Sequence, residues 1–502
     1  MKYEYKTLAT IRHKVFTEVS KMAFNDCFDC IEDIPYEIIE GDVATYRESA
    51  FLERAIVGER IRLAMGLNLR PNDKHRPIHE GIELANIPEK YYEAPLINII
   101  KFACDACPTL SYEVTNMCRG CLAHPCVEVC PTKAVSMING KSVIDQENCI
   151  NCGLCAQACP YSAIIKHERP CATACGVDAI GSDENGRAEI DYDKCVSCGM
   201  CLVNCPFGAI SDKSQIYQLI QAMNQDNDII AVVAPSFLGQ FGKNVGFNDF
   251  KRSLIELGFK DVVEVAIGAD ICTIEEAIDF VEKVPNVLDF MATSCCPSWS
   301  VMAKQNFPDY KENISMAQTP MVFSARLVRE TNKDAKIVFI GPCSAKKLEA
   351  SRKSVKSEVD FVITFEELSG MLEAQDIEVK GTDRSFNDEA TAGGRGFAIT
   401  GGVAKAVSNL IKKNHPEREV KTYSADGLRE CVKMCKDAVK GKYDGYLLEG
   451  MACPGGCIAG AGCLAKPSAA TGQVKVATKL SKLHLSDESK YSDKLHLLQE
   501  NK

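Results

Sequence analysis

Apolar side chains recur at helical spacing through the first hundred residues. In AFLERAIVGERIRLAMGL, residues 50–67, they stand three or four positions apart, which is typical of an amphipathic helix. We therefore expect residues 1–100 to form a helical N-terminal region. Cys27 and Cys30 lie there without a second pair nearby, so structural or incidental thiols are favoured over metal ligands.

From residue 216 onward the pattern alternates between strand and helix signals. Apolar runs at 228–236, 262–270 and 286–294 predict strands, and amphipathic stretches at 247–259 and 273–284 predict helices between them. Such alternation predicts an α/β domain with a parallel sheet, which we assign to residues 216–466. The polar residues 467–502 predict a surface helix or tail whose two histidines are solvated.

Composition adds the chemistry. The chain has 502 residues, 27 cysteines and a formal net charge of -10, which indicates a multidomain globular protein and argues against nucleic acid as a partner. The first residues, MKYEYKTLATIRHKVF, lack the features of a secretory signal, so we expect the cytoplasm, where thiols stay reduced. No apolar run reaches membrane-spanning length. The cysteines therefore predict metal or redox chemistry.

Sixteen cysteines fall in residues 101–215, which contain four copies of one half-motif: CVEVCPTKAV, CAQACPYSAI, CATACGVDAI and CLVNCPFGAI. The first two copies complete spacings that resemble a bacterial two-cluster ferredoxin, an α+β fold in which the fourth cysteine reaches the other 4Fe-4S cluster. One cluster is then expected on Cys118, Cys121, Cys126 and Cys159, and the other on Cys149, Cys152, Cys155 and Cys130. Zinc is disfavoured, because zinc sites use separated pairs and do not need the crossed Cys-Pro pattern.

The other two copies suggest an outer pair of clusters, with the inner ferredoxin inserted between them. One would be held by Cys195, Cys198, Cys201 and Cys175, and the other by Cys104, Cys107, Cys171 and Cys205. This hypothesis uses every cysteine of the module. The long-range pairing is its least secure part.

Four predicted strands of the C-terminal half end in unusual loops. They are AVVAPS, FMATSCCPSW, VFIGPCSAKK and LLEGMACPGGC. Loops at the carboxyl ends of strands in open α/β sheets converge on one crevice, so thiols remote in sequence are expected to meet there. These thiols are Cys296, Cys343, Cys453 and Cys457. The alternative is four buried, inert cysteines.

Three segments carry a family resemblance: TSCCPSW, GPCSAKKLE and EGMACPGGC resemble the signature segments of the FeFe hydrogenases. Together with the ferredoxin-like module, the resemblance covers about residues 101–466. It implies an H-cluster catalytic domain, in which a 4Fe-4S cube is joined to a two-iron unit that carries carbonyl, cyanide and azadithiolate. It further implies reversible oxidation of hydrogen gas, a ferredoxin or similar small electron carrier, and hydrogenase maturation proteins as partners.

The resemblance also implies residue roles. Cys296, Cys343, Cys453 and Cys457 match the cube ligands, with Cys457 as the bridge; Lys346, Pro235, Ser236 and Met451 match residues around the two-iron unit; Cys295, Glu276, Asp279 and Ser315 match the proton path. Asp279 is one methylene shorter than the glutamate usual in the family, which puts the hydrogen-bond chain in doubt.

Gly341, Met321 and Ala461 also depart from the family pattern, while Cys272, Cys431, Cys435 and Cys463 are assigned to packing. Two other functions stay open. One is a narf-like iron–sulfur assembly or scaffold protein without the two-iron unit, and the other is a hydrogen sensor.

Overall fold

The N-terminal helices form one layer of the molecule. The computed structural model describes residues 8–71, 73–89, 94–225, 227–352, 355–382, 386 and 388–499. Its first elements are α1 (Leu8–Phe24), η1 (Asp29–Glu32), α2 (Ile34–Ile38), α3 (Ala50–Ala64) and α4 (Ile82–Ala85). The Ser49 hydroxyl caps α3 by accepting the Leu52 amide at 3.2 Å. The expected helical N-terminal region is confirmed.

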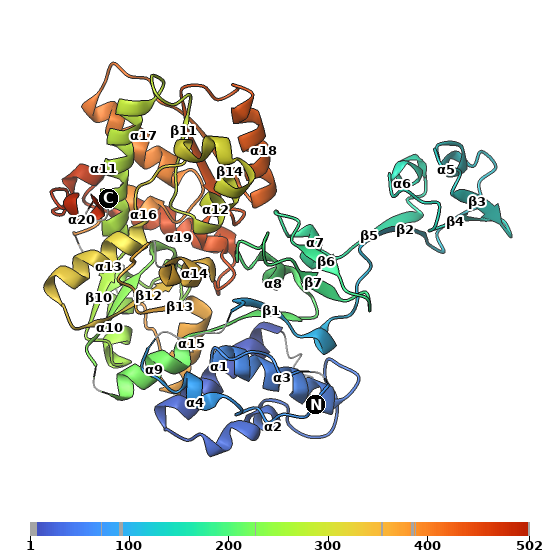
Figure 1. The fold of residues 1–502 in the computed structure, drawn as a ribbon, viewed down its shortest axis with the longest axis horizontal. Coiled ribbons are helices and arrows are strands. Elements are labelled where there is room, and N and C mark those ends of the chain that lie inside the picture. The colour runs from blue at the N-terminus through green and yellow to red at the C-terminus, as the bar shows by residue number, and fades with distance from the viewer. Residues whose placement is uncertain are drawn as a thin grey trace.

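The cysteine-rich module consists of short hairpins and single-turn helices. Its antiparallel pairs are β1 (Ile97–Ile99) with β8 (Ile210–Asp212), β2 (Leu110–Val114) with β5 (Ile164–Glu168), β3 (Val135–Ile138) with β4 (Lys141–Ile144), and β6 (Ile180–Ser182) with β7 (Ala188–Ile190). The short helices are η2 (Lys101–Ala103), α5 (Pro125–Glu128), α6 (Leu154–Ala158), α7 (Pro170–Thr173) and α8 (Met200–Asn204). The part from β2 to β5 extends away from the rest of the protein as an arm (Figure 1).

The C-terminal half contains two parallel sheets rather than one. The first has the order β10-β9-β12-β13 and comprises β9 (Ile229–Val233), β10 (Asp261–Glu264), β12 (Lys336–Gly341) and β13 (Phe361–Thr364). The second has the order β11-β15-β14 and comprises β11 (Met291–Ala292), β14 (Lys421–Asp426) and β15 (Tyr446–Met451). The α/β class with parallel sheets after ferredoxin-like modules is confirmed.

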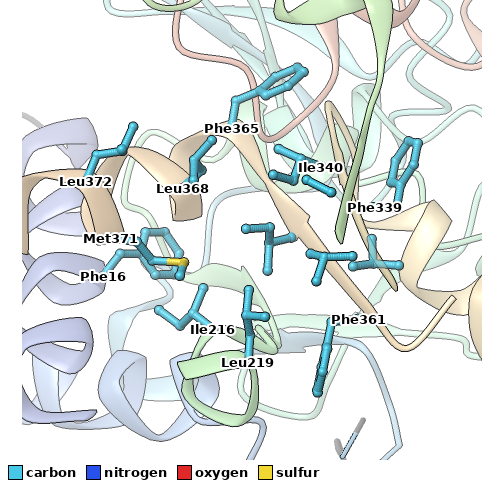
Figure 2. Close-up of a cluster of buried hydrophobic side chains, with 14 of the residues drawn as sticks. Phe16, Ile216, Leu219, Phe339, Ile340, Phe361, Phe365, Leu368, Met371 and Leu372 are labelled. Atoms are coloured by element: carbon cyan, nitrogen blue, oxygen red, sulfur yellow. The ribbon is translucent and has the colours of Figure 1, made fainter. Parts of the chain in front are cut away.

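Helices surround both sheets (Figure 1). They are α9 (Ile216–Asn224), η3 (Pro235–Phe237), α10 (Phe247–Glu256), α11 (Ala266–Lys283), α12 (Pro297–Asn306), η4 (Pro308–Asn313), α13 (Pro320–Thr331), α14 (Ala345–Ser351), α15 (Phe365–Ala374), α16 (Ala392–Gly396), α17 (Gly402–Asn414), α18 (Leu428–Val439), η5 (Cys457–Ala459), α19 (Pro467–Leu480), η6 (Ser486–Glu488) and α20 (His496–Gln499). Figure 2 shows the main core, where Phe16 of α1 packs beside Met371 of α15 and Ile216 of α9. The N-terminal layer therefore shares a core with the first sheet.

Two predicted strands are wrong in extent. The run 262–270 leaves its strand after Glu264 and continues as α11 from Ala266, and the run 286–294 keeps only two strand residues. A fully buried helix and a buried strand are both continuously apolar, so their pattern does not separate them. Gly268 fits this helix for a steric reason, because a Cβ there would lie 2.4 Å from the Pro320 carbonyl oxygen.

The last segment packs on the domain more closely than a surface tail would. Ala470, Val474 and Ala477 of α19 are buried, and Leu497 packs with Ile271 and Phe323. Both histidines of this segment are exposed, as expected. Among the described residues no helix is long and apolar enough to cross a membrane.

A buried ion cluster joins the cysteine-rich module to the first sheet. Lys347 of α14 donates to Asp212 at 2.9 Å and to Glu367 at 2.7 Å, and all three side chains are buried. The two carboxylates supply the negative charge that a buried lysine requires. The end of β8 is thereby fixed against α14 and α15.

Candidate active site

The four thiols predicted to converge line a single cavity between the two sheets. Cys343 follows β12 of the first sheet, Cys453 and Cys457 follow β15 of the second, and Cys296 precedes α12. The cavity has an empty volume of about 820 Å³. The loops therefore converge as expected, but they come from two sheets that face each other across the cavity.

Burial disfavours the thiolate form of these cysteines, and backbone amides offset part of that effect at Cys296. Burial raises the pKa of Cys296, while the amides of Trp299 and Ala452 lower it. Burial likewise raises the pKa of Cys343 to about 11. Iron coordination would supply the positive charge that keeps such thiols deprotonated. Gly456, which lines the cavity, has φ +96°, and a Cβ there would lie 2.7 Å from the Thr400 amide nitrogen, so the neighbouring backbone requires glycine at this position.

Lys346 is the one charged side chain of the described residues that lines this cavity. Its Nζ donates to the Cys295 carbonyl oxygen at 3.3 Å and to Glu349 at 2.6 Å. Burial acts to lower the pKa of Lys346, but the Glu349 carboxylate raises it above the usual value. The cavity therefore contains a permanent cation.

Pro235, Ser236 and Met451 line the same cavity. The Ser236 hydroxyl is buried and has no hydrogen-bond partner in the part of the chain that the structure describes. A buried hydroxyl without a partner is costly unless a ligand completes it. The orphan hydroxyl and the half-buried Lys346 thus fit a group with polar, anionic ends.

A buried carboxyl group lies behind Cys295. Glu276 is 2% exposed and accepts the Ser294 amide at 3.4 Å. Burial raises the pKa of Glu276 to about 8, although the Ser294 amide and the Ser315 hydroxyl lower it. Burial and the nearby Glu276 also raise the pKa of Cys295 well above its usual value. The structure therefore brings together three of the four residues assigned to the proton path.

Asp279 lies one turn further along α11. It is half-buried and pairs with Lys283 at 2.9 Å. Its carboxylate is thus engaged near the surface, away from the cavity lining.

Two positions that depart from the family pattern, Gly341 and Met321, lie at or beside the central cavity. A Cβ at Gly341 would lie 2.2 Å from the Phe339 ring, and Phe339 itself lines the cavity. The ring therefore occupies space that a larger residue at 341 would need. Met321 also lines the cavity.

The outer cysteines divide into two groups, as hypothesised. Cys104, Cys107, Cys171 and Cys205 line one cavity of about 310 Å³, and Cys175, Cys195, Cys198 and Cys201 line another of about 350 Å³. Amides donate to the sulfurs in both groups: Ala188 to Cys104 at 3.3 Å, Ala209 to Cys205 at 3.4 Å and Ala179 to Cys175 at 3.3 Å. Thiols with donated N–H groups around an open space fit iron–sulfur clusters.

The inner cysteines gather in the arm. Cys126, Cys130, Cys149, Cys155 and Cys159 share one small core, and the Ser142 amide donates to Cys118 Sγ at 3.5 Å. Cys121 is half-buried and Cys152 is exposed. The repeated alanine four residues after the last cysteine of a half-motif serves as an amide donor here too, since Ala163 donates to Cys159 Sγ at 3.4 Å.

The sequence did not predict that two further groups of residues line the central cavity. Cys198 lines both its own cavity and the central one, and Ser298 beside it donates to the Val196 carbonyl oxygen at 3.0 Å. Phe397 and Ala398 close another wall. The glycine-rich run AGGRGFAITGG around them was the available signal.

Six cysteines lie outside the cluster-forming groups described above. Cys431 and Cys435 pack in the core of the second sheet, Cys272 donates to the Gln318 carbonyl oxygen at 2.9 Å, and Cys463 donates to the Cys457 carbonyl oxygen at 3.5 Å. Cys30 donates to the Cys27 carbonyl oxygen at 2.7 Å near the surface.

The fold and the site define an iron–sulfur oxidoreductase class. Residues 227–461 match the family described as iron only hydrogenase large subunit, C-terminal domain, and residues 142–165 and 188–211 match the 4Fe-4S binding domain. The chain belongs to the iron-only hydrogenase family and carries N-terminal 4Fe-4S ferredoxin-type domains.

Two hydrogenases are similar to this chain over most of their length, and one cluster assembly factor is similar over about a third of its length. The periplasmic Fe hydrogenase large subunit of Nitratidesulfovibrio vulgaris is 30% identical over 390 residues, which cover 67% of this chain and 89% of that protein. Iron hydrogenase 1 of Clostridium pasteurianum is 27% identical over 442 residues, covering 77% and 76%. The cytosolic Fe-S cluster assembly factor NAR1 of Scheffersomyces stipitis is 28% identical over 184 residues, covering 31% and 34%.

Proposed function

We propose that this protein is a hydrogenase that catalyses the reversible oxidation of hydrogen gas to protons and electrons. The observation that carries the proposal is the single buried cavity where four thiols meet Lys346 and the unpartnered Ser236 hydroxyl. A lone 4Fe-4S cube needs only the thiols. The lysine and the hydroxyl are additional groups suited to anionic ligands.

The site fits an H-cluster. Cys296, Cys343, Cys453 and Cys457 would hold the cube, with Cys457 as the bridge to the two-iron unit. When bound, the two-iron unit supplies the metal chemistry that splits hydrogen gas. Lys346 would hold one cyanide by charge, Pro235 and Ser236 would flank the other, and Met451 would pack near the bridging carbonyl.

The chain's own residues would move the proton. Cys295 lies at the cavity and Glu276 behind it, and the raised pKa of Glu276 keeps this carboxyl group protonated at neutral pH. Because its pKa lies close to neutral pH, the protonated carboxyl group can donate its proton, and the carboxylate that remains can accept the next one, at nearly equal cost. Ser315 would bridge outward to Asp279, whose carboxylate pairs with Lys283.

Electrons would travel along the cysteine-rich module. Cys198 lines both its own cavity and the central one, so a cluster on Cys175, Cys195, Cys198 and Cys201 would stand next to the cube. The second outer cluster and the two clusters of the arm would continue the path toward a ferredoxin or similar small carrier. Residues 101–215 would thus form the electron-transfer domain and residues 216–466 the catalytic domain.

An iron–sulfur assembly factor is the second candidate, because NAR1 shares part of the sequence. A scaffold of this kind is expected to lack the two-iron unit. The space beside the thiols, the charge of Lys346 and the thiol of Cys295 favour the hydrogenase.

Infrared spectroscopy of protein produced with the hydrogenase maturation proteins tests the proposal. Bands of iron-bound carbonyl and cyanide, together with hydrogen uptake and evolution, are expected. Their absence from fully matured protein would favour the scaffold, and carbonyl bands with very slow turnover at every potential would favour a hydrogen sensor. Iron analysis of the cysteine-rich module should find about sixteen irons by the count of four per cube; about eight would remove both outer clusters.

A further inference from the structure

Three arginines bind backbone carbonyls beside the cysteines of the cavity lined by Cys104, Cys107, Cys171 and Cys205, and Arg169 also lines that cavity. Arg47 donates to the carbonyl oxygens of Ala103 at 2.9 Å and Phe207 at 2.7 Å. Arg60 donates to the Gly208 carbonyl oxygen. Each of these carbonyls lies within three residues of a cysteine of the cavity.

Arg169 approaches the same cavity from the base of the arm. It donates to the Cys107 carbonyl oxygen at 2.7 Å and to those of Gly181 and Gly186 at 2.6 Å each. Arg60 and Arg169 are 4% and 2% exposed. Two of the three guanidinium groups are therefore buried beside the thiols.

None of the three forms an ion pair with a carboxylate in the described ranges. Arg12, the cationic neighbour of Arg60, is neutralised by Glu366. Asp105 lines the cavity but is exposed, so solvent screens its charge. The buried carboxylate on this side is Glu53, which accepts the Arg47 backbone amide at 2.9 Å and forms no ion pair with the three guanidinium groups. Buried guanidinium groups without a paired carboxylate are costly, and a further anion nearby would stabilise them.

The neighbouring cavity lacks this feature. The side chains that line the space around Cys175, Cys195, Cys198 and Cys201 are uncharged. Arg429 reaches the Cys175 carbonyl oxygen at 3.4 Å, but it is exposed and pairs with Asp178 at 3.0 Å. The two outer groups of thiols thus have similar amide donors, but only the first has buried arginines bound to the backbone beside its cysteines.

We infer that Arg47, Arg60 and Arg169 raise the reduction potential of a 4Fe-4S cluster held by Cys104, Cys107, Cys171 and Cys205, making it the outer cluster that accepts an electron more readily. This inference rests on the proposed assignment of that cluster. Taking up one electron and no proton adds one negative charge to the cluster. Buried positive charge favours the reduced form, and net charge and hydrogen bonds are established determinants of cluster potential.

The helical N-terminal region would then help to set the reduction potential of this cluster. Arg60 belongs to α3 and Arg47 to the segment before it, and both reach across to the cysteine-rich module. Removing either charge should therefore alter one cluster without disturbing the catalytic cavity. Both arginines are positioning residues that tune electron transfer.

The test is a redox titration of the full-length, cluster-loaded protein followed by electron paramagnetic resonance. Cys171→Ser identifies the signal of this cluster by removing it. Arg47→Gln and Arg60→Gln should each lower the equilibrium constant for its one-electron reduction at least tenfold, which is a shift of about 59 mV to more negative potential. Arg60→Lys keeps the charge and should shift the potential less.

Arg54→Gln is the matched control. Arg54 lies on the same helix and donates to the carbonyl oxygens of Ile39 and Gly41, away from the cysteines, so the potential should stay unchanged. An unshifted potential in both glutamine variants with the signal retained would overturn the inference, as would an equal shift of every cluster. Loss of the cluster from both variants would also overturn it, because the arginines would then serve assembly. If the spectrum of Cys171→Ser contains every signal of the wild-type spectrum, the proposed cluster itself is refuted.

Discussion

Replacing Glu276 with glutamine tests the proton path directly. Glu276 is buried, and its Oε2 atom has no hydrogen-bond partner within the described part of the chain. Glutamine has the same shape and is neutral, like the protonated acid, but it cannot release a proton. We expect Glu276→Gln to lower turnover by about 10²- to 10⁴-fold, the usual contribution of a positioned acid or base.

The same substitution should stabilise the fold at neutral pH. Burial raises the pKa of Glu276 to about 8, whereas a carboxyl group in the unfolded chain titrates near its ordinary value of 4.5. At pH 7 the group is protonated when folded and ionised when unfolded, which costs about 3 kcal/mol at 1.36 kcal/mol per pKa unit. The unfolded state binds fewer protons between these two pKa values, so wild-type stability falls as pH rises from about 4.5 to about 8.

Hydrogen evolution and thermal unfolding of matured protein, measured at several pH values, check both effects. The midpoint of Glu276→Gln should exceed that of wild type at pH 7, and the difference should shrink toward pH 4.5. Glu282→Gln, at an exposed position of the same helix, is the control and should change neither quantity. Wild-type turnover in Glu276→Gln with an intact infrared spectrum would refute the assigned path.

Three other substitutions separate catalysis from stability. Cys295→Ala should keep the carbonyl and cyanide bands and lower turnover at least about 100-fold, and unchanged turnover would remove Cys295 from the relay. Lys347→Met leaves buried carboxylates unpaired and should destabilise the protein by about 3–5 kcal/mol in thermal or denaturant unfolding, whereas Lys283→Met, which breaks a partly exposed pair, should cost less than about 1 kcal/mol. Gly341→Met should cost about 1–3 kcal/mol through overlap with Phe339, and the same substitution should cost less when it is made in a Phe339→Ala background; an undiminished melting temperature in the single variant would contradict this steric explanation.

Short-range spacing was enough to predict much of the iron–sulfur module. Cysteines that stand two to four positions apart must lie on one loop, so a regular motif predicts that its closely spaced cysteines lie near one another. The grouping of Cys104 with Cys171 and Cys205 went further and relied on counting which ligands each half-motif lacked. Their common cavity agrees with that grouping.

The positions of segments that are far apart in the sequence were harder to predict. The loops after β12 and β15 belong to different sheets, and each run of strands and helices predicts a parallel sheet without saying how many sheets form. The sequence pattern also did not show where a buried strand ends and a buried helix begins. The chain changes from strand to helix at Val265, within one continuous apolar run. The contacts of Arg47 and Arg60 with residues about 150 positions away left no trace in local pattern.

The base of the arm lies on the electron path proposed above. The arm joins the module through the paired strands β2 and β5, and β5 ends at Glu168, directly before Arg169 and the α7 cysteine Cys171. Arg169 binds the carbonyl of Cys107, so one buried side chain both holds the two connections of the arm together and places charge beside the thiols. Any electron that enters through the arm's proposed clusters would have to pass this junction before it reaches Cys198 and the central cavity. A cluster of raised potential at that junction would retain an electron until the catalytic cavity takes it, which makes the arginines a means of matching one-electron delivery to the two electrons that each molecule of hydrogen requires.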